Sequence, residues 1–333
     1  MVTLSAYNIQ SQRDLDGVYE LTIVTENHNL NANDEDVTSS MSRILSLDLS
    51  NIIVLNIILP SWYNNSINIP CLPNLKELRC SNCIITTIPE LPMLEKLYLS
   101  GCHSLVEISA KLSNLKELSL INCSIAIIPA LPKLEKVSFS NCPIYLIPKL
   151  PNLEELNCSD CANLTVISVD LPNLKRLNYQ RCYNITSIPN LPNLEKLTFR
   201  GTYINIPELS NLTYLNCSYS KLSSLPQLPS LTNLECSGCT ELTTLPIMPR
   251  LTAINYYGCT NLKTHTIPLG LQNINYLSIN TIIAAVEYNS ENMKYLRKLI
   301  KPQSTLLNKS STLYSEIQEL VLSSMLVKSA AFY

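Results

Sequence analysis

LPNLKELRCSNCIITTIPE, residues 72–90, begins again with changes about ten times along this 333-residue chain. The leucine or methionine that opens each copy recurs at intervals of 18 to 23 residues. These openings are Leu72, Leu91, Leu112, Leu131, Leu150, Leu171, Leu191, Leu209, Leu228, Met248 and Leu271. One copy is too short to bury its own apolar face, so we predict that successive copies stack on one another.

Within each copy the central leucines alternate with polar residues. A period of two predicts a short strand, with Leu78 and Cys80 on the inward face. Glu77, Arg79 and Ser81 then face outward on the same strand. We therefore predict one parallel strand of about three to five residues in every repeat, with neighbouring strands about 4.8 Å apart.

The Pro-x-x-Pro phrase that follows the strand predicts how the chain returns to the next copy. Pro89 and Pro92 fix their φ angles and remove two backbone donors, which favours an extended return over a helix. In other sequences this spacing is a ligand for aromatic grooves. Here it recurs with the repeat, so we interpret it as part of the repeat backbone.

The repeat resembles the leucine-rich repeat superfamily, whose L-x-x-L-x-L-x-x-N/C-x-L core it matches over roughly residues 72–280. The resemblance implies a leucine-rich repeat solenoid, a curved parallel β-sheet with extended convex returns, whose concave strand face commonly binds protein partners. The phrase IPxLPNLxxL is most similar to the short class found in secreted bacterial effectors. The composition, rich in Asn and Ile, is similar to leucine-rich repeat proteins of giant DNA viruses.

The irregular ends suggest three regions. Residues 1–71 are predicted to be an N-terminal cap that looks extended up to residue 40 and contains one or two degenerate repeats. The L-x-x-L-x-L spacing places such repeats at Val18–Ile23 and again at Ile44, Leu47 and Leu49. Residues 72–280 form the solenoid, and residues 281–333 are predicted to be a C-terminal helical cap of two helices separated near Pro302.

Bulk properties narrow the partners and the compartment. Charged residues are 15% of the chain and the net charge is -2, which disfavours nucleic acid and anionic membrane surfaces. No basic segment followed by an apolar run opens the sequence, and no stretch of 18 apolar residues follows. We therefore expect a cytoplasmic protein, in the host cytoplasm if it is viral, that is not secreted through a signal peptide.

The thirteen cysteines follow the repeat register, so we expect reduced thiols. The first cysteine of each Cys-x-x-Cys pair, such as Cys80, replaces an inward apolar residue, and the second occupies a shared turn position. In leucine-rich repeats Asn or Cys at that position bonds the backbone of neighbouring turns, and a buried thiol suits this role. No histidine shares the register, so no metal site is predicted. The resulting structural cysteine ladder consists of Cys83, Cys102, Cys123, Cys142, Cys161, Cys182, Cys239 and Cys259.

Two outward columns of charged residues alternate in sign between stacked repeats. Exposed ion pairs of this kind are each worth only ~0–1 kcal/mol, but they favour one register. The first column is Lys76, Glu95, Lys116, Glu135, Glu154, Lys175 and Glu195. The second column is Glu77, Lys96, Glu117, Lys136, Glu155, Arg176 and Lys196.

From Leu209 onward the charges leave these columns and tyrosines appear. Tyrosine offers a large contact area with a polar handle, which is typical of binding hot spots. We therefore predict a partner-binding patch on the C-terminal half of the strand face, with ordinary polar drift of a solvated sheet as the alternative. The patch consists of Tyr214, Asn216, Tyr219, Asn233, Asn255, Tyr257 and Tyr276.

Catalysis is poorly supported by the sequence. The three histidines share no register, and the six glycines form no phosphate-cradling loop. We expect no cofactor and no small-molecule substrate, and we interpret the chain as a non-catalytic scaffold for an unidentified protein partner. The alternatives are a self-assembling structural component and a substrate-recruiting adaptor of a ubiquitin ligase.

Overall fold

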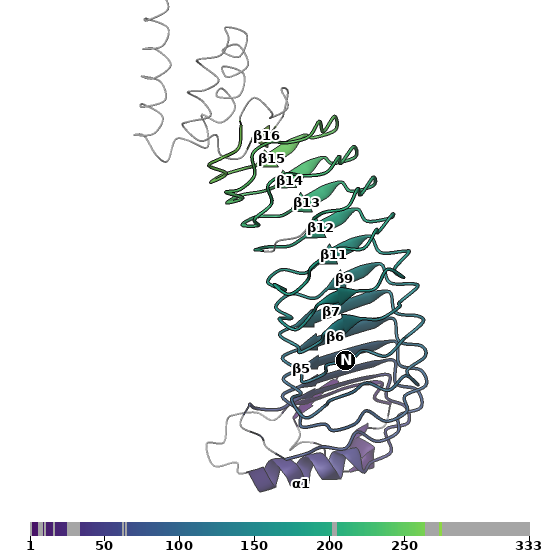
Figure 1. Cartoon of the computed structure of the whole chain (residues 1–333). Helices are drawn as coiled ribbons and strands as arrows, with labels where there is room; N and C mark the ends of the chain where they lie inside the picture. Colours follow the sequence, from purple (N-terminus) through teal and green to yellow (C-terminus); the bar gives the residue numbers. More distant parts are fainter. Residues whose placement is uncertain are drawn as a thin grey trace, which may run out of the picture. The chain divides into compact units, whose positions relative to one another are not determined.

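The computed structural model of the chain describes residues 2–5, 9, 11–15, 17–24, 34–61, 63, 65–201, 205–263 and 273–274. The chain divides into two compact units, Met1–Asn216 and Cys217–Tyr333. Figure 1 shows the described strands coloured along the sequence. Trp62, Tyr276 and the whole segment 281–333 lie outside the described residues, so the C-terminal helical cap stays a prediction.

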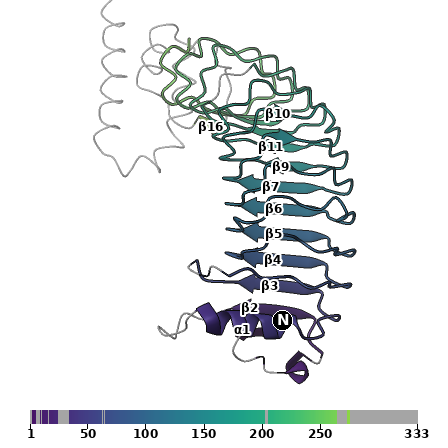
Figure 2. The same cartoon turned by 60° about the horizontal axis from the view of Figure 1, so that its bottom comes forward.

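The first unit is a parallel sheet to which each repeat adds one strand, and Figure 2 shows these strands stacked side by side. Every neighbouring pair runs parallel, as in the in-register pairing of Leu78 with Leu97 and of Leu97 with Leu118. The strands are β1 (Val2–Ser5), β2 (Glu20–Val24), β3 (Val54–Ile58), β4 (Glu77–Ser81), β5 (Lys96–Ser100), β6 (Glu117–Ile121), β7 (Lys136–Ser140), β9 (Glu155–Asn157), β11 (Arg176–Asn178), β12 (Lys196–Thr198) and β13 (Tyr214–Asn216).

The second unit repeats this arrangement on a smaller scale. Its described strands are β14 (Asn233–Glu235), β15 (Ala253–Asn255) and β16 (Asn273–Ile274). β14 pairs in parallel with β15, and β15 pairs in parallel with β16. A short strand is enough to pair each repeat with its neighbour, because the other buried leucines of the repeat lie on the returns.

Strict alternation of burial along the strands confirms the predicted inward and outward faces. In β4, Leu78 and Cys80 are buried, whereas Arg79 between them is exposed. The same register repeats in both units, and its inward leucines form the core. At ~1.5–3 kcal/mol for each fully buried aliphatic side chain, stacking supplies the apolar driving force that a single repeat lacks. The predicted leucine-rich repeat solenoid is therefore the observed fold.

The returns are extended, and no helix interrupts them between residues 72 and 263 of the described chain. The phrase LPNL closes a turn in which the Leu75 N–H bonds the Leu72 carbonyl at 3.2 Å, a position that suits proline as the second residue. Its asparagine forms a second ladder, because the Asn114 Nδ2 donates to the Pro92 carbonyl at 2.7 Å and Asn152 does the same to Pro132 at 2.8 Å.

The cysteines line the inner wall beside the strand ends, and all eight of the predicted ladder positions are described. The Cys102 Sγ donates to the Cys80 carbonyl of the preceding repeat at 3.8 Å, and the Cys142 Sγ donates to the Leu120 carbonyl at 3.5 Å. Equivalent bonds to the preceding repeat come from Cys83, Cys123, Cys182, Cys239 and Cys259. Cys161 instead bonds the Ser159 carbonyl of its own repeat at 3.7 Å, and burial raises its pKa to about 12.

One repeat of the second unit departs from the ladder. Ser220 occupies the cysteine position there, is 1% exposed, and its hydroxyl oxygen has no hydrogen-bond partner among the described residues. The residue before each ladder position adopts a left-handed φ, which Asn, Asp and Gly tolerate best. Tyr219, with a φ of 60°, is an exception to this preference.

Two expectations for the N-terminal region are wrong. Residues 1–40 are not uniformly extended, because a 3-10 helix forms at Gln12–Leu15 and helix α1 begins at Asp34 and ends at Leu45. α1 buries Met41 and Ile44 on one face, a spacing that its polar neighbours obscured.

Ile44, Leu47 and Leu49 do not form a strand. The strand of this repeat is β3, whose buried Leu55 and Ile57 follow Ile52 with the same L-x-x-L-x-L spacing further along the chain. The spacing at Val18–Ile23, in contrast, does mark a strand, β2.

Candidate functional site: a groove on the strand face

The predicted recognition patch is divided by the structure. Its members in the first unit are Tyr214 and Asn216, both on β13. Its members in the second unit are Tyr219, Asn233, Asn255 and Tyr257. Tyr276 lies outside the described residues. The structure therefore describes no single site that contains all seven residues, and their joint role in recognition stays a prediction.

Some of these side chains are already engaged within the second unit. The Tyr219 ring packs on Gly238, where an added Cβ would lie 2.7 Å from the ring. The Asn255 Oδ1 accepts the backbone N–H of Tyr257 at 3.2 Å, while the Tyr257 side chain is 61% exposed. Tyr219 and Asn255 thus have structural contacts, and Tyr257 has the more available surface.

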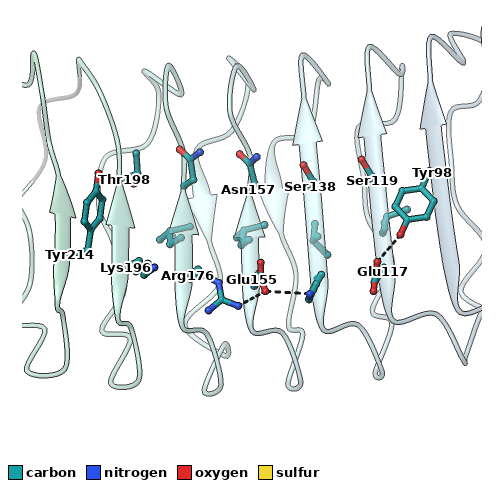
Figure 3. Close-up of a pocket in the computed structure, with 16 residues that line it drawn as sticks. Tyr98, Glu117, Ser119, Ser138, Glu155, Asn157, Arg176, Lys196, Thr198 and Tyr214 are labelled. Atoms are coloured by element: carbon teal, nitrogen blue, oxygen red, sulfur yellow. Dashed lines mark hydrogen bonds and ion pairs between the residues drawn. The ribbon is translucent and has the colours of Figure 1, made fainter. Parts of the chain in front are cut away.

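A groove of about 500 Å³ lies on the strand face of the first unit. Tyr98 on β5 and Tyr214 on β13 mark its two ends, as Figure 3 shows. Six strand steps separate β5 from β13 in the sheet, which at about 4.8 Å per step gives a length of roughly 29 Å. Of the seven predicted binding residues, Tyr214 alone lines this groove.

Charged side chains form one wall of the groove and pair across neighbouring strands. Glu155 is the central member, because it accepts an ion pair from Arg176 and another from Lys136 at 3.5 Å. Glu117 pairs with Lys96 at 3.3 Å. These lateral pairs confirm the alternation predicted for the outward columns.

The Tyr98 end of the groove is held by a compact polar cluster. The Tyr98 hydroxyl donates to the Glu117 Oε2 at 2.6 Å, and the Arg79 guanidinium lies 4.1 Å from the Tyr98 ring centroid. Arg79 also pairs with Glu77 at 2.5 Å. The stacked cation and the charged acceptor together fix the orientation of the ring.

The electrostatics of the wall keep its carboxyl groups ionised. The hydrogen bond from Arg176 lowers the pKa of Glu155, and the hydrogen bond from Tyr98 lowers the pKa of Glu117. Burial, followed by the bond to Glu117, raises the pKa of Tyr98 to about 12. A depressed carboxyl pKa is the opposite of what a general acid at neutral pH needs, so the wall is suited to binding rather than to proton transfer.

The floor of the groove is a row of small neutral side chains at the second outward position of successive strands. The Oδ1 of Asn157 accepts the backbone N–H and hydroxyl of Ser159, at 3.3 and 2.7 Å, and the Oδ1 of Asn178 accepts the Gln180 N–H at 3.2 Å. Each amide therefore leaves its Nδ2 donor for a ligand. The complete row is Ser119, Ser138, Asn157, Asn178 and Thr198.

This floor was not predicted from the sequence, where charged and aromatic residues were taken as the signals of a site. The signal was present in the second outward column, where small hydrogen-bonding residues follow Tyr98 from Ser119 to Thr198. From the sequence, this half of the sheet was expected to carry only a ladder of paired charges. That ladder exists, but it is one wall of a groove rather than the whole surface.

Within the described part of the chain, no group of three or more His, Cys, Asp and Glu side chains is placed to hold a metal ion. In that same part, none of the helices has the length and apolar character needed to cross a bilayer.

Comparison with known proteins gives structural neighbours alone. No protein-family model and no curated protein sequence matches the chain. YopM from Yersinia enterocolitica is similar over 68% of this chain and 55% of its own, with 22% identity and a TM-score of 0.49. The Toll–Spätzle complex of Drosophila is similar over 86% and 44%, with 17% identity and a TM-score of 0.41.

A third neighbour is the leucine-rich repeat domain of the type III effector XopL, with 15% identity and a TM-score of 0.30 over 74% of this chain and 85% of that domain. The chain spans about half the length of the first two neighbours. All three TM-scores are below 0.5, so the fold assignment depends on this chain's own strand register and buried leucines.

Proposed function

We propose that the chain is a non-catalytic scaffold that binds a segment of a partner protein in the groove of the first unit. The row of unengaged donors along the floor is the observation that carries this proposal. Nδ2 groups of Asn157 and Asn178 lie in neighbouring strands of a parallel sheet, with Arg176 and Glu155 on the wall beside them. Neutral donors beside ordered charges can bond a peptide backbone and select its side chains.

The dimensions of the groove support a linear segment as the occupant. Its length of roughly 29 Å accommodates about nine residues of extended chain at ~3.3 Å each. Its volume lies within the usual range of ligand sites. Tyr98 and Tyr214 at the two ends supply the aromatic contacts that dominate many protein interfaces.

A finer proposal concerns the setting in which the scaffold acts. The IPxLPNLxxL phrase supports an effector-type or viral modulator that occupies a host protein in the cytoplasm. The ladder supports a reducing compartment, because thiols such as Cys102 and Cys142 bond carbonyls as free thiols. Exclusion of nucleic acid and membrane as partners is part of this proposal and follows from the low net charge.

Affinity purification with mass spectrometry tests the proposal when three forms of the full chain are compared. Ser138→Trp fills the centre of the floor with a bulky ring. Ser187→Trp adds the same ring at an exposed position on a return and is the matched control. We expect one protein to be captured by the wild type and the control but lost from Ser138→Trp. Equal capture by all three forms would exclude the groove as the binding site.

Self-association is a second candidate function, supported by an apolar row on the returns of the first unit. Ile127, Leu146 and Val166 occupy neighbouring repeats, and Ile127 and Val166 are 58% and 51% exposed. β8 (Leu146–Ile147) and β10 (Val166–Ile167) hold two of them in one small parallel sheet. Apolar rows of this kind can meet across a two-fold axis, so a second copy is the proposed occupant.

Sedimentation velocity distinguishes this second candidate. The combined change Ile127→Ser and Val166→Ser removes the apolar side chains without touching the groove. A concentration-dependent dimer that disappears in the double variant supports self-association through this row. A monomeric wild type at all concentrations would rule it out.

A further inference from the structure

The wall of the groove changes character at one point along its length. From β4 to β11 the first outward residues of paired strands alternate in sign at every step, ending with Glu155 against Arg176. The next step pairs Arg176 with Lys196, two cations on adjacent strands. Like charges directly opposite one another destabilise a sheet, so the alternation of charge ends here although the strands stay in register.

Lys196 forms no ion pair with the carboxylates of the wall. Glu155, which lies two strands away on β9, already accepts Arg176 and Lys136. Glu195 precedes Lys196 on the chain, but among the described residues no carboxylate forms an ion pair with the Lys196 ammonium. An exposed cation next to a second cation therefore remains at this end of the groove.

The neutral groups around Lys196 can all donate hydrogen bonds. Asn178 faces Thr198 across the β11–β12 pair, and Lys196 faces Tyr214 across the β12–β13 pair. Figure 3 shows Lys196, Thr198 and Tyr214 at the same end of the groove, which Asn178 also lines. The Asn178 Oδ1 is occupied by the Gln180 N–H, which leaves the Nδ2 donor exposed to a ligand. We name this set the donor corner: Asn178, Lys196, Thr198 and Tyr214.

We propose that the donor corner binds the carboxylate of an aspartate or glutamate in the linear segment that occupies the groove. This inference rests on the proposed function and specifies the chemistry of its partner. One carboxylate supplies a negative charge for the Lys196 ammonium and acceptor oxygens for the neighbouring donors. It would also relieve the repulsion between Arg176 and Lys196. A dianionic phosphate fits less well, because Arg176 is already engaged by Glu155.

Selection from a phage-displayed library of random linear peptides tests the inference on the full chain. Lys196→Gln removes the charge and Lys196→Glu reverses it. The matched control is Lys76→Glu, which reverses an exposed charge on the same unit outside the groove. We expect wild type and control to select peptides with Asp or Glu at one shared position. Lys196→Glu should select Lys or Arg at that position instead.

Synthetic peptides from the selection give the quantitative readout. We expect Lys196→Gln to weaken the acidic peptide about tenfold, and an Asp→Asn or Glu→Gln change in the peptide to weaken wild-type binding by a similar factor. The two changes combined should cost little more than either alone, because they remove the same interaction. A phosphoserine peptide that binds tighter than the carboxylate peptide would overturn the choice of a carboxylate.

Failure of this inference is distinguishable from failure of the proposed function. One outcome is that selected peptides lose binding to Ser138→Trp yet share no acidic position and bind the Lys196 variants as tightly as the wild type. In that case the groove binds peptides, but the donor corner does not select an acidic residue. If no selected peptide responds to Ser138→Trp, the groove is not a peptide site and both proposals are wrong.

Discussion

The strand faces of the two units have the same framework but carry different surfaces. In the first unit Lys136, Glu155 and Arg176 occupy the first outward position of successive strands and pair laterally. In the second unit the same position holds the neutral Asn233 and Ala253. The inward leucines beneath both faces are equally buried. The inward residues therefore determine the solenoid, and the outward columns are free to build a site.

The largest expected effect tests whether the inward framework is equivalent in both units. Leu156→Ala and Leu234→Ala each truncate a leucine that is at most 2% exposed, one in each unit. Each should lower the free energy of unfolding of its own unit by about 2–5 kcal/mol, from lost burial and a residual cavity. Native-state hydrogen exchange would localise the loss to the repeats around the substitution.

Unequal losses of unfolding free energy at Leu156 and Leu234 would show that the inward frameworks of the two units are not equivalent. A loss below about 1 kcal/mol at Leu234, with a full loss at Leu156, would mean that the second unit is not held by its leucines as the first unit is. Phe139→Leu, a smaller change at a buried position of β7, provides the control for ordinary repacking.

The next effect concerns the left-handed turn that precedes each ladder position. Gly238→Ala should lower the free energy of unfolding of the second unit by about 1–2 kcal/mol, because φ is 68° there and the Tyr219 ring occupies the space of a Cβ. Urea denaturation measures the change. Asn141→Gly, at a φ of 52° in the first unit, should stay within about 0.5 kcal/mol of the wild type. Equal destabilisation by both changes would show that the turns are not governed by φ.

These results also mark what the sequence could predict. The repeat fixed the parallel strands, the inward alternation and the extended returns, because burial leaves the inward residues few alternatives. The sequence-based prediction was wrong at α1, where Met41 and Ile44 are surrounded by polar residues. It was also wrong at β3, where a misleading L-x-x-L-x-L spacing preceded the one that marks the strand.

The groove was predicted less well than the fold. Its charged wall followed from alternating columns, but its floor consists of Ser, Asn and Thr, which are common on any solvated sheet. The geometry of the turns decides which of their atoms form no hydrogen bond, as the bond from the Gln180 N–H to the Asn178 Oδ1 illustrates. Residue spacing in the sequence does not predict this geometry. The tyrosine-rich column could therefore be recognised from the sequence more easily than the groove.

Acid provides a test in which the two faces should differ. The folded pKa of Glu155 is below its usual value of 4.5 because of Arg176, so the unfolded chain binds the proton first as pH falls. Its contribution to stability is complete above the unfolded pKa and is lost as pH falls through the folded pKa. Glu155→Gln should flatten the acid dependence of the first unit, measured by urea midpoints from pH 6 to about pH 3. An unchanged slope would show that the wall pairs do not stabilise the native state.

The smallest expected effect is the coupling within a single wall pair. A double-mutant cycle with Lys96→Ala and Glu117→Ala should give about 0.5 kcal/mol, since both side chains are partly exposed. The same cycle on Lys149 and Asp170, an exposed pair at 3.8 Å away from the groove, should give a value near zero. A larger coupling energy for Lys149 and Asp170 than for Lys96 and Glu117 would mean that the groove wall holds its ion pairs no better than the rest of the surface.

The most direct test of the central claim is a calorimetric affinity measurement with the partner captured by the wild-type chain. Three proteins are compared: the wild type, Ser138→Trp in the groove of the first unit, and Tyr257→Ser on the exposed surface of the second unit. The groove account predicts at least a tenfold loss of affinity for Ser138→Trp and no change for Tyr257→Ser. Wild-type affinity in Ser138→Trp, with the loss at Tyr257→Ser instead, would contradict it and place recognition on the second unit.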